Sequence, residues 1–355
     1  MTETFQIEIQ RTAASRLAQT DFSNLQFGKI FTDHMLVCDF EDGYWHNPQI
    51  VPFGDLSISP ANVTLHYGQT IFEGLKAYKN DAGEIVVFRP QAHLDRFNRS
   101  AVRMCMPQIN EEVFIGGITE LLKLDKNWFP ANEGSSLYIR PFMFATDNTI
   151  GVHISNRYKF IILINPVDKY YSEPLKVVIE NKYVRAAEGG IGFAKTAGNY
   201  ASSLYPTKLA VQKGYHQLIW TDHKEHKYIE ESGTMNIMAI IGDTLITPPL
   251  SDSILAGITR DSVLILARDW GFKVDERKVS VDEIFEAHEK GLLKDIFGTG
   301  TAAVIAHISL INYKGKDYIM PEIESREFSK RLGESLLNIR LGRVKDTHGW
   351  IYKVD

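Results

Sequence analysis

Several features are scarce in this chain of 355 residues, and each scarcity excludes a class of protein. The two cysteines, Cys38 and Cys105, are far apart and form no C-x-x-C pair, so neither a disulfide framework nor a cysteine-rich metal site is supported. Positive charge is not in excess, because 39 Lys and Arg residues face 44 Asp and Glu residues, and no strong local basic cluster is present. Nucleic acid is therefore not an expected partner.

Long hydrophobic runs are also missing. No stretch approaches 18 consecutive apolar residues, so we expect neither a membrane span nor a membrane partner. Residues 1–20 include Glu3 and Glu8 and lack the apolar segment of a secretory signal. The histidines show no H-E-x-x-H or similar spacing, which argues against a catalytic metal. A cytoplasmic enzyme is the simplest expectation.

The chain is long enough for two domains, and both halves mix helical and strand patterns. In the first half, an Asn80-Asp81-Ala82-Gly83 turn between two apolar runs predicts a β-hairpin. Pro90 then opens a helical pattern, since proline suits a first turn. The other elements expected in this half are strands at 34–40, 135–145 and 158–166 and a helix at 111–128.

A polar, proline-terminated break at 168–174 predicts the interdomain linker. It separates a smaller α/β domain at 1–167 from a larger domain at 175–355. Ser280 and Glu283 match a capping box ahead of a helix. The remaining expected elements are strands from 175 and at 216–221 and 235–241, and helices at 200–213, 259–270 and 324–341. The expected fold class is mixed α/β in two domains.

The segment Gly192-Phe193-Ala194-Lys195-Thr196-Ala197-Gly198-Asn199-Tyr200 places one lysine among small residues, with no carboxylate in the window. So small a backbone can approach a ligand closely. A lysine held there, away from water and anions, would carry a reactive neutral amine suited to a Schiff base with an aldehyde cofactor. A solvated lysine in an ordinary glycine-rich loop remains the alternative.

Two further positions carry polar groups in suggestive surroundings. Strand alternation puts Tyr138 and Arg140 on one face, where they could hold a carboxylate-bearing ligand, although an exposed strand face is the alternative. Glu231 could supply the carboxylate that a pyridoxal ring requires at its nitrogen. Sequence position alone does not choose between Glu231 and its neighbour Glu230, and an exposed acidic pair is also possible.

Three segments could bind phosphate. Gly257-Ile258-Thr259 leads directly into a helix, whose first amides and dipole attract anions, unless Thr259 simply caps an ordinary helix. Gly298-Thr299-Gly300-Thr301-Ala302 is a second small-residue loop that could present amides and hydroxyls. Arg96 lies mid-helix near Arg99 and Arg103, where a charged helix face paired with Asp95 is expected unless one of these arginines points inward to a phosphate.

Taken together, these segments resemble the branched-chain-amino-acid aminotransferases, members of the fold-type IV group of pyridoxal-phosphate enzymes. The likeness covers nearly the whole chain, and the ordered set is far more specific than any one motif. It includes Phe72-Glu73-Gly74-Leu75-Lys76-Ala77-Tyr78, Tyr138-Ile139-Arg140-Pro141, Lys195-Thr196-Ala197-Gly198-Asn199-Tyr200, Glu231-Ser232-Gly233-Thr234-Met235-Asn236, Gly257-Ile258-Thr259-Arg260 and Gly298-Thr299-Gly300-Thr301-Ala302.

The resemblance implies a cofactor, pyridoxal 5'-phosphate, and an active site between two domains, the larger of which contains a pseudo-barrel. Lys195 is similar to the lysine that forms the Schiff base and then shuttles the proton. Tyr200 corresponds to the tyrosine at the phenolic oxygen, and Glu231, not Glu230, to the carboxylate at the ring nitrogen. The phosphate ligands implied are Arg96, Ile258, Thr259 and Thr301.

For the substrate, the resemblance implies that Tyr67 and the amides of Thr301 and Ala302 receive the α-carboxylate. Tyr138 and Arg140 correspond to a polar wall. Phe27 and Phe72 should line the apolar pocket, with Val152 reaching in from a partner subunit of a homodimer. Thr234 completes the implied substrate-binding set.

The implied activity is reversible transfer of the amino group of leucine, isoleucine or valine to 2-oxoglutarate, giving L-glutamate by ping-pong kinetics. A D-amino-acid transaminase or an aminodeoxychorismate lyase shares the fold and the lysine, and remains the alternative. A non-enzymatic binding protein on this fold is disfavoured, because the lysine, glutamate and phosphate set is intact.

Overall fold

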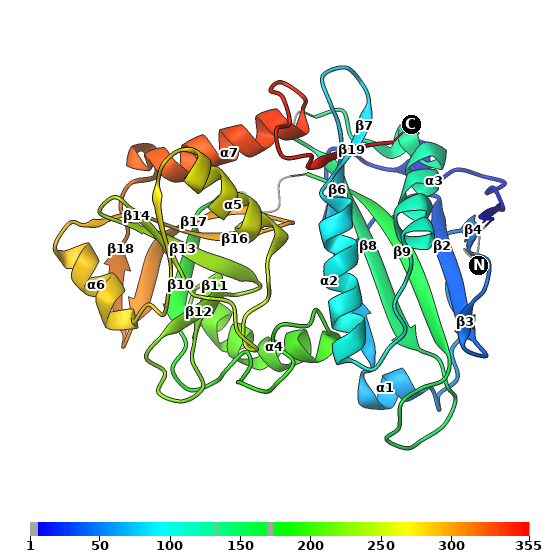
Figure 1. The fold of residues 1–355 in the computed structure, drawn as a ribbon, viewed down its shortest axis with the longest axis horizontal. Coiled ribbons are helices and arrows are strands. Elements are labelled where there is room, and N and C mark those ends of the chain that lie inside the picture. Colours follow the sequence, from blue (N-terminus) through cyan, green and yellow to red (C-terminus); the bar gives the residue numbers. More distant parts are fainter. Residues whose placement is uncertain (1–5, 133, 169–172, 355) are drawn as a thin grey trace. The chain divides into compact units, whose positions relative to one another are not determined.

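The computed structural model describes residues 6–132, 134–168 and 173–354, and its chain divides into two compact units (Figure 1). The first unit comprises Met1–Tyr170, Ala194–Ala197 and Leu337–Asp355, and the second comprises Tyr171–Phe193 and Gly198–Leu336. Of the predicted linker at 168–174, residues 169–172 lie outside the described part. Two segments that the sequence placed in the second domain thus belong to the first unit, partly because the strand β19 (Ile351–Lys353) pairs with β7 (Ile85–Phe88).

A mixed sheet organises the first unit. Its described strands follow the order β1-β4-β2-β9-β8-β6-β7-β19, with β3 paired to β2 and β5 paired to β8. The remaining bounds are β1 (Glu8–Ile9), β2 (His34–Glu41), β3 (Tyr44–Trp45), β4 (Gln49–Pro52), β5 (Thr70–Phe72), β6 (Leu75–Lys79), β8 (Ser136–Ala145) and β9 (Tyr158–Val167). The predicted hairpin is confirmed, since β6 and β7 pair antiparallel.

Helices pack on this sheet around a continuous apolar core. α2 (Pro90–Arg103) begins with proline, as predicted, and buries Leu94 and Phe97. The predicted helix at 111–128 is divided into three shorter pieces. Gly117 in α3 lets that helix approach β2 closely, because a Cβ there would lie 2.5 Å from the Leu36 side chain. The bounds are η1 (Leu17–Gln19), α1 (Val63–Tyr67), η2 (Glu112–Gly116), α3 (Gly117–Leu124) and η3 (Lys126–Trp128).

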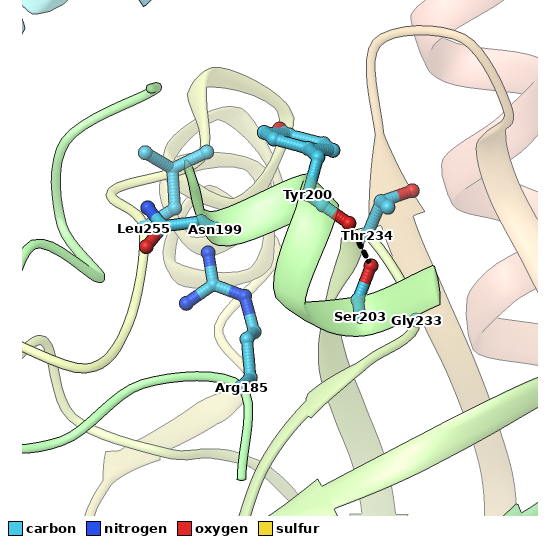
Figure 2. A pocket seen from close by; sticks show the side chains of 7 residues that line it. All are labelled: Arg185, Asn199, Tyr200, Ser203, Gly233, Thr234 and Leu255. Carbon is cyan, nitrogen blue, oxygen red and sulfur yellow. Dashed lines mark hydrogen bonds between the residues drawn. The ribbon is translucent and has the colours of Figure 1, made fainter. Parts of the chain in front are cut away.

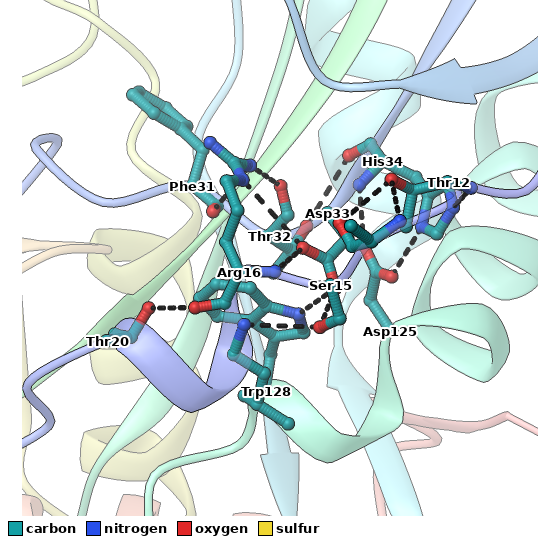
Figure 3. Close-up of polar contacts among 12 residues, drawn as sticks. Thr12, Ser15, Arg16, Thr20, Phe31, Thr32, Asp33, His34, Asp125 and Trp128 are labelled. Carbon is teal, nitrogen blue, oxygen red and sulfur yellow. Dashed lines mark hydrogen bonds and ion pairs between the residues drawn. The ribbon is translucent and has the colours of Figure 1, made fainter.

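A partly buried polar network fastens the N-terminal segment to residues at the start of β2 (Figure 3). The Asp33 carboxylate accepts hydrogen bonds from Ser15 Oγ, the Arg16 amide and Trp128 Nε1. The Thr12 amide donates to His34 Nε2 at 2.9 Å, so Nδ1 carries the imidazole proton and donates to Asp125 at 2.7 Å.

The second unit is built on a ring of strands. The pairing order β12-β11-β10-β17-β16-β13 closes on itself, because β12 also pairs with β13. β14 and β15 extend the sheet from β13, and β18 pairs with β17. The bounds are β10 (Leu175–Ile179), β11 (Gln217–Thr221), β12 (Ile229–Ser232), β13 (Met235–Ile241), β14 (Thr244–Thr247), β15 (Lys273–Glu276), β16 (Leu293–Gly300), β17 (Val304–Tyr313) and β18 (Lys316–Ile319).

The helices expected after residue 175 are present, with shifted ends. They are α4 (Ala197–Gln212), α5 (Ile258–Asp269), α6 (Val281–Glu289), η4 (Ile323–Ser325) and α7 (Glu327–Arg340). One hydrogen bond of the predicted capping box is confirmed, since the Glu283 amide donates to Ser280 Oγ at 3.1 Å. Arg326 is buried and donates to three backbone carbonyls, Ile296, Ile308 and Pro321, which fixes the chain ahead of α7.

Candidate active site

Lys195 lies two residues before α4, and both its backbone amide and its backbone carbonyl form hydrogen bonds. The Lys195 amide donates to Ser100 Oγ at 2.9 Å, and its carbonyl accepts from the Phe72 amide at 3.0 Å. Thr196 Oγ1 donates to the Thr70 carbonyl at 2.7 Å. The side chain of Lys195 is half-buried, and its Nζ lies 4.7 Å from the centre of the Phe72 ring. The lysine therefore has a rigid base from which only its side chain can swing.

Three more predicted substrate residues continue outward from that ring in the same unit. The Arg140 guanidinium lies 4.7 Å from the Phe72 centroid, and its Nη2 donates to Tyr138 Oη at 3.1 Å. The Tyr138 ring meets Phe27 edge-on, with centroids 4.9 Å apart. Tyr138 is buried, so this is not the exposed strand face that was the alternative. The structure thus joins Lys195, Phe72, Arg140, Tyr138 and Phe27 in one aromatic and cationic wall, called the wall below.

Two neighbours shape the wall. A Cβ at Gly74 would lie 1.9 Å from Tyr138 Oη, so only glycine leaves room for that phenol. Lys76 pairs across the sheet with Tyr138, and both side chains are buried. Burial, with a smaller contribution from Arg340, lowers the pKa of Lys76 to about 7.

Arg96 points inward, not along a charged helix face. Its side chain is buried and forms a two-point ion pair with Glu73, from Nε to Oε1 at 2.6 Å and from Nη2 to Oε2 at 2.9 Å. The expected alternative, pairing with Asp95, is wrong, because Arg96 lies on the buried side of α2 while Asp95 accepts a hydrogen bond from Gln91.

Tyr67 and Val152 lie at the surface of the chain. Tyr67 ends α1 and is 43% exposed, whereas Val152 is 88% exposed in the loop between β8 and β9. Ile150 and Ile154 in the same loop are also exposed, so the loop presents three apolar side chains. Exposed apolar groups so close together are typical of a contact surface.

In the second unit, residues from several segments of the chain line a small pocket that is open to solvent (Figure 2). Tyr200, from α4, and Thr234, from the turn between β12 and β13, both line it, and each was predicted from the sequence. Tyr200 is half-buried and its carbonyl accepts from Ser203 Oγ at 2.7 Å. The full lining is Arg185, Asn199, Tyr200, Ser203, Gly233, Thr234 and Leu255.

The structure distinguishes Glu231 from Glu230. The Glu231 carboxylate is buried, pairs with Arg185 Nε at 2.9 Å, and accepts from the Leu255 amide at 2.7 Å. Both of these partners line the pocket. Glu230 is buried too, but it accepts from Ser253, and burial raises its pKa. Of the two carboxylates, Glu231 is the one bonded to pocket-lining residues.

The start of α5 is connected to this carboxylate through a short segment. Asn236, which pairs with Glu231 across the strands, donates to the Leu255 carbonyl at 2.9 Å, and α5 begins three residues after Leu255. Gly257 is the N-cap, and it has no side chain with which to cap this helix. The alternative of a Thr259 cap is wrong, because Thr259 already lies in the first turn. Ile258 and Thr259, both buried, therefore occupy the anion-attracting end.

Thr301 and Ala302 lie in the tight turn between β16 and β17, where Gly300 pairs with Val304. Beside this turn, Thr299 faces Asn236 across the strands. Thr299 Oγ1 is buried without a hydrogen-bond partner in the part of the chain that the structure describes. An unsatisfied buried hydroxyl suggests a site for a ligand or water.

The glycine before Lys195 has a different purpose from the one expected. A Cβ at Gly192 would lie 2.6 Å from the Asp252 carbonyl oxygen and 2.7 Å from Ser253 Cα. Gly192 thus allows two backbone segments to pack together, and the nearby space is occupied by protein.

Three residues that sequence reasoning missed support the predicted ones: Arg185 pairs with Glu231, Glu73 pairs with Arg96, and Ser100 holds Lys195. Each partner is remote in sequence, so no local pattern reveals it. Among the described residues, no group of three or more His, Cys, Asp or Glu is placed to hold a metal ion, and no helix is long and apolar enough to cross a membrane.

Comparison with known proteins gives a consistent result. The family model for amino-transferase class IV matches residues 70–311. The chain is 45% identical to branched-chain-amino-acid transaminase 1 of Bacillus subtilis, over 94% of this chain and 95% of the relative. It is also 45% identical to a probable branched-chain-amino-acid aminotransferase of Staphylococcus aureus, over 99% of this chain and 98% of that protein.

Solved structures agree. A branched-chain aminotransferase from Thermoproteus uzoniensis, crystallised with norvaline, aligns with a TM-score of 0.75 and 25% identity over 91% of this chain and 100% of that one. The branched-chain amino acid aminotransferase of Escherichia coli aligns with a TM-score of 0.73 and 26% identity, over 91% of this chain and 99% of that one. The chain therefore belongs to the class IV aminotransferases, among the branched-chain-amino-acid aminotransferases of fold type IV.

Proposed function

We propose that this chain reversibly transfers the amino group of leucine, isoleucine or valine to 2-oxoglutarate, giving the branched 2-oxo acid and L-glutamate. The observation that carries the proposal is the buried Glu231 carboxylate. It is bonded to residues that line the same pocket as Tyr200, and one of these residues lies a short segment before the start of α5. The names of the relatives at 45% identity support the choice of amino donor.

We infer that the cofactor is pyridoxal 5'-phosphate, and the donor set of the chain fits it. A buried carboxylate suits a protonated ring nitrogen, a phenol suits the phenolic oxygen, and a helix start with a glycine N-cap suits a phosphate. The residues that would hold the cofactor are Lys195, Arg96, Tyr200, Glu231, Ile258, Thr259 and Thr301. When bound, it would supply an electron sink for the charge left at Cα once the substrate proton is removed.

Arg185 contributes by holding Glu231 in place. Its Nε lies 2.9 Å from one carboxylate oxygen, and the Leu255 amide donates to the other at 2.7 Å. Arg185 is itself held by the carbonyls of Gly192 and Ser253. Glu231 therefore stays an acceptor for a ring N–H and needs no reorganisation during turnover.

Lys195 would carry the proton. Its amine would remove the proton from the substrate Cα and return it to C4′ of the cofactor, on the other side of the amino nitrogen, as a general base followed by a general acid. The fastened backbone supports this role, because Ser100 and Phe72 hold the main chain while the four-carbon side chain moves between the two atoms.

The wall accounts for two kinds of substrate. Phe27 and Phe72 offer apolar surface to an aliphatic side chain, while Arg140 and Tyr138 offer donors to the second carboxylate of 2-oxoglutarate or glutamate. Tyr67 and the amides of Thr301 and Ala302 would receive the α-carboxylate. We further propose a homodimer in which the exposed Val152 of one subunit completes the pocket of the other.

The test is a spectrum followed by a donor screen. The purified chain, loaded with pyridoxal 5'-phosphate, should show the visible band of a lysine-bound cofactor, and L-leucine should bleach it with release of one 2-oxo acid per site. Steady-state assays with 2-oxoglutarate should then rank L-leucine, L-isoleucine and L-valine above D-alanine.

A visible band that L-leucine leaves unchanged would contradict the proposal. A preference for D-alanine would favour a D-amino-acid transaminase, and pyruvate release from aminodeoxychorismate would favour the lyase. As a control, Lys195→Ala should lose the band and the turnover together, because no other amine replaces it.

A further inference from the structure

Glu73 is a fully buried carboxylate to which the steps above assign no role. It follows Phe72 at the end of β5, and its two oxygens accept four hydrogen bonds from the first unit. Arg96 donates twice, His93 Nδ1 lies 2.7 Å from Oε2, and the Gly74 amide donates to Oε2 at 3.0 Å. One of these bonds ends on Oε1 and the other three on Oε2, so both oxygens of the carboxylate are bonded within the protein.

The charges of this group balance within the protein. Burial opposes ionisation of Glu73, but the charge of Arg96 and the hydrogen bonds from His93 and Arg96 more than offset it and hold its pKa well below the usual range. Burial lowers the pKa of His93, so the imidazole is neutral and donates from Nδ1. The result is one carboxylate and one guanidinium in a two-point pair, an arrangement that fixes the plane of the guanidinium.

The same group of residues adjoins the lysine. His93, Arg96 and Ser100 lie on one side of α2, and all three are buried. Ser100 accepts from the Lys195 amide, and the Phe72 amide, one residue before Glu73, donates to the Lys195 carbonyl. Glu73 is therefore bonded to the helix face that also holds the base of Lys195.

We propose that Glu73 is a positioning residue that aims Arg96 at the phosphate of the cofactor; this rests on the proposed function, in which Arg96 is a phosphate ligand. Glu73 neutralises a buried guanidinium before any ligand arrives, and its two-point contact sets the direction of the remaining guanidinium edge. Without that carboxylate, the arginine would keep its charge but lose its orientation.

The experiment compares two ligands that differ only in the phosphate. The full-length chain is freed of cofactor and titrated with pyridoxal 5'-phosphate and with pyridoxal, and the ratio of the two dissociation constants is taken for each variant. Arg96→Gln should reduce the preference for the phosphorylated ligand by about tenfold or more. Glu73→Gln should reduce it by a similar factor, and the double variant should be no worse than Arg96→Gln alone.

A matched control separates positioning from general damage. Asp125 is also a buried carboxylate of the first unit bonded to a histidine, His34 (Figure 3). Asp125→Asn should lower the unfolding temperature, yet leave the ratio of dissociation constants unchanged. A ratio that falls in Asp125→Asn as far as in Glu73→Gln would overturn the proposal.

The two hypotheses fail differently. If Arg96→Gln leaves the ratio unchanged, the proposed phosphate role of Arg96 is wrong, and the positioning role falls with it. If Arg96→Gln reduces the ratio and Glu73→Gln does not, only the positioning role is wrong. Should Glu73→Gln not fold, Glu73→Asp keeps the charge but is one methylene too short for the two-point pair, and a wild-type ratio in that variant would overturn the proposal.

Discussion

Adjacent side chains in this protein can have unrelated surroundings, and Glu230 and Glu231 illustrate the point. Strand alternation sends them to opposite sides of β12, where one meets Ser253 and the other meets Arg185 and the Leu255 amide. The two glutamates are chemically identical, and they differ only in the groups that they contact.

A pair of matched substitutions tests this difference. Glu231→Gln should lower kcat about a hundredfold or more, because a neutral amide cannot keep a ring nitrogen protonated. Glu230→Gln should leave kcat within a few-fold of wild type, since its partner is a hydroxyl outside the pocket lining. Steady-state kinetics with L-leucine measure both, and equal losses in the two variants would contradict the assignment.

At the scale of elements, the start of α6 depends on one side chain. Ser280 Oγ accepts from the Glu283 amide, which is otherwise one of the unpaired donors of a helix start. Ser280→Ala should lower the free energy of unfolding by about 1 kcal/mol, measured by urea denaturation. Ser280→Asp, which restores an acceptor, should recover most of it, while activity stays at the wild-type value in both.

The strand β6 contains a group whose protonation opposes folding at neutral pH. The pKa of Lys76 is lowered from 10.5 to about 7, so between these values the unfolded chain binds a proton that the folded chain does not. Stability should therefore rise with pH across this window, and fall as pH drops toward 7.

The measurement compares urea unfolding at pH 7 and pH 9.5. Wild type should gain roughly 3 kcal/mol relative to Lys76→Met, which has no titrating group there. A Lys76→Met profile that parallels wild type would show that Lys76 does not titrate in this window.

At the scale of the whole molecule, the proposed homodimer predicts complementation between inactive chains. Lys195→Ala lacks the catalytic lysine, and Val152→Asp would place a charge in the partner's apolar pocket. In a mixed dimer, the intact Lys195 of one chain meets the intact Val152 of the other, so one site is restored. Mixing the two after reversible dissociation should return about a quarter of wild-type sites, because half of the dimers are mixed.

Activity assays on the mixture and on each parent alone measure the effect. A mixture no more active than the average of its parents would exclude a shared site. Sedimentation of the same samples establishes whether the chains associate at all.

Local pattern was enough for most strands and helices. Alternation located β8, a nearly continuous apolar run located β9, proline located the start of α2, and the Ser280 box located α6. The start of α4 was missed by three residues, because Ala197 and Gly198 have no helical periodicity. The second unit ends at Leu336, before the expected end at 355. The C-terminal strand pairs with an edge of the first sheet, and sequence alone does not say which free edge such a strand will join.

The sequence by itself determined the family, since the order of its motifs is specific and each motif is continuous in the chain. It also identified residues that could carry the chemistry, such as Lys195 in its segment of small residues. Only the tertiary structure decided which partner each group has: Arg185 for Glu231, Glu73 for Arg96, Ser100 and Phe72 for Lys195. The physical reason is that a buried charge needs a countercharge, but the one it finds depends on which distant segments the fold brings together.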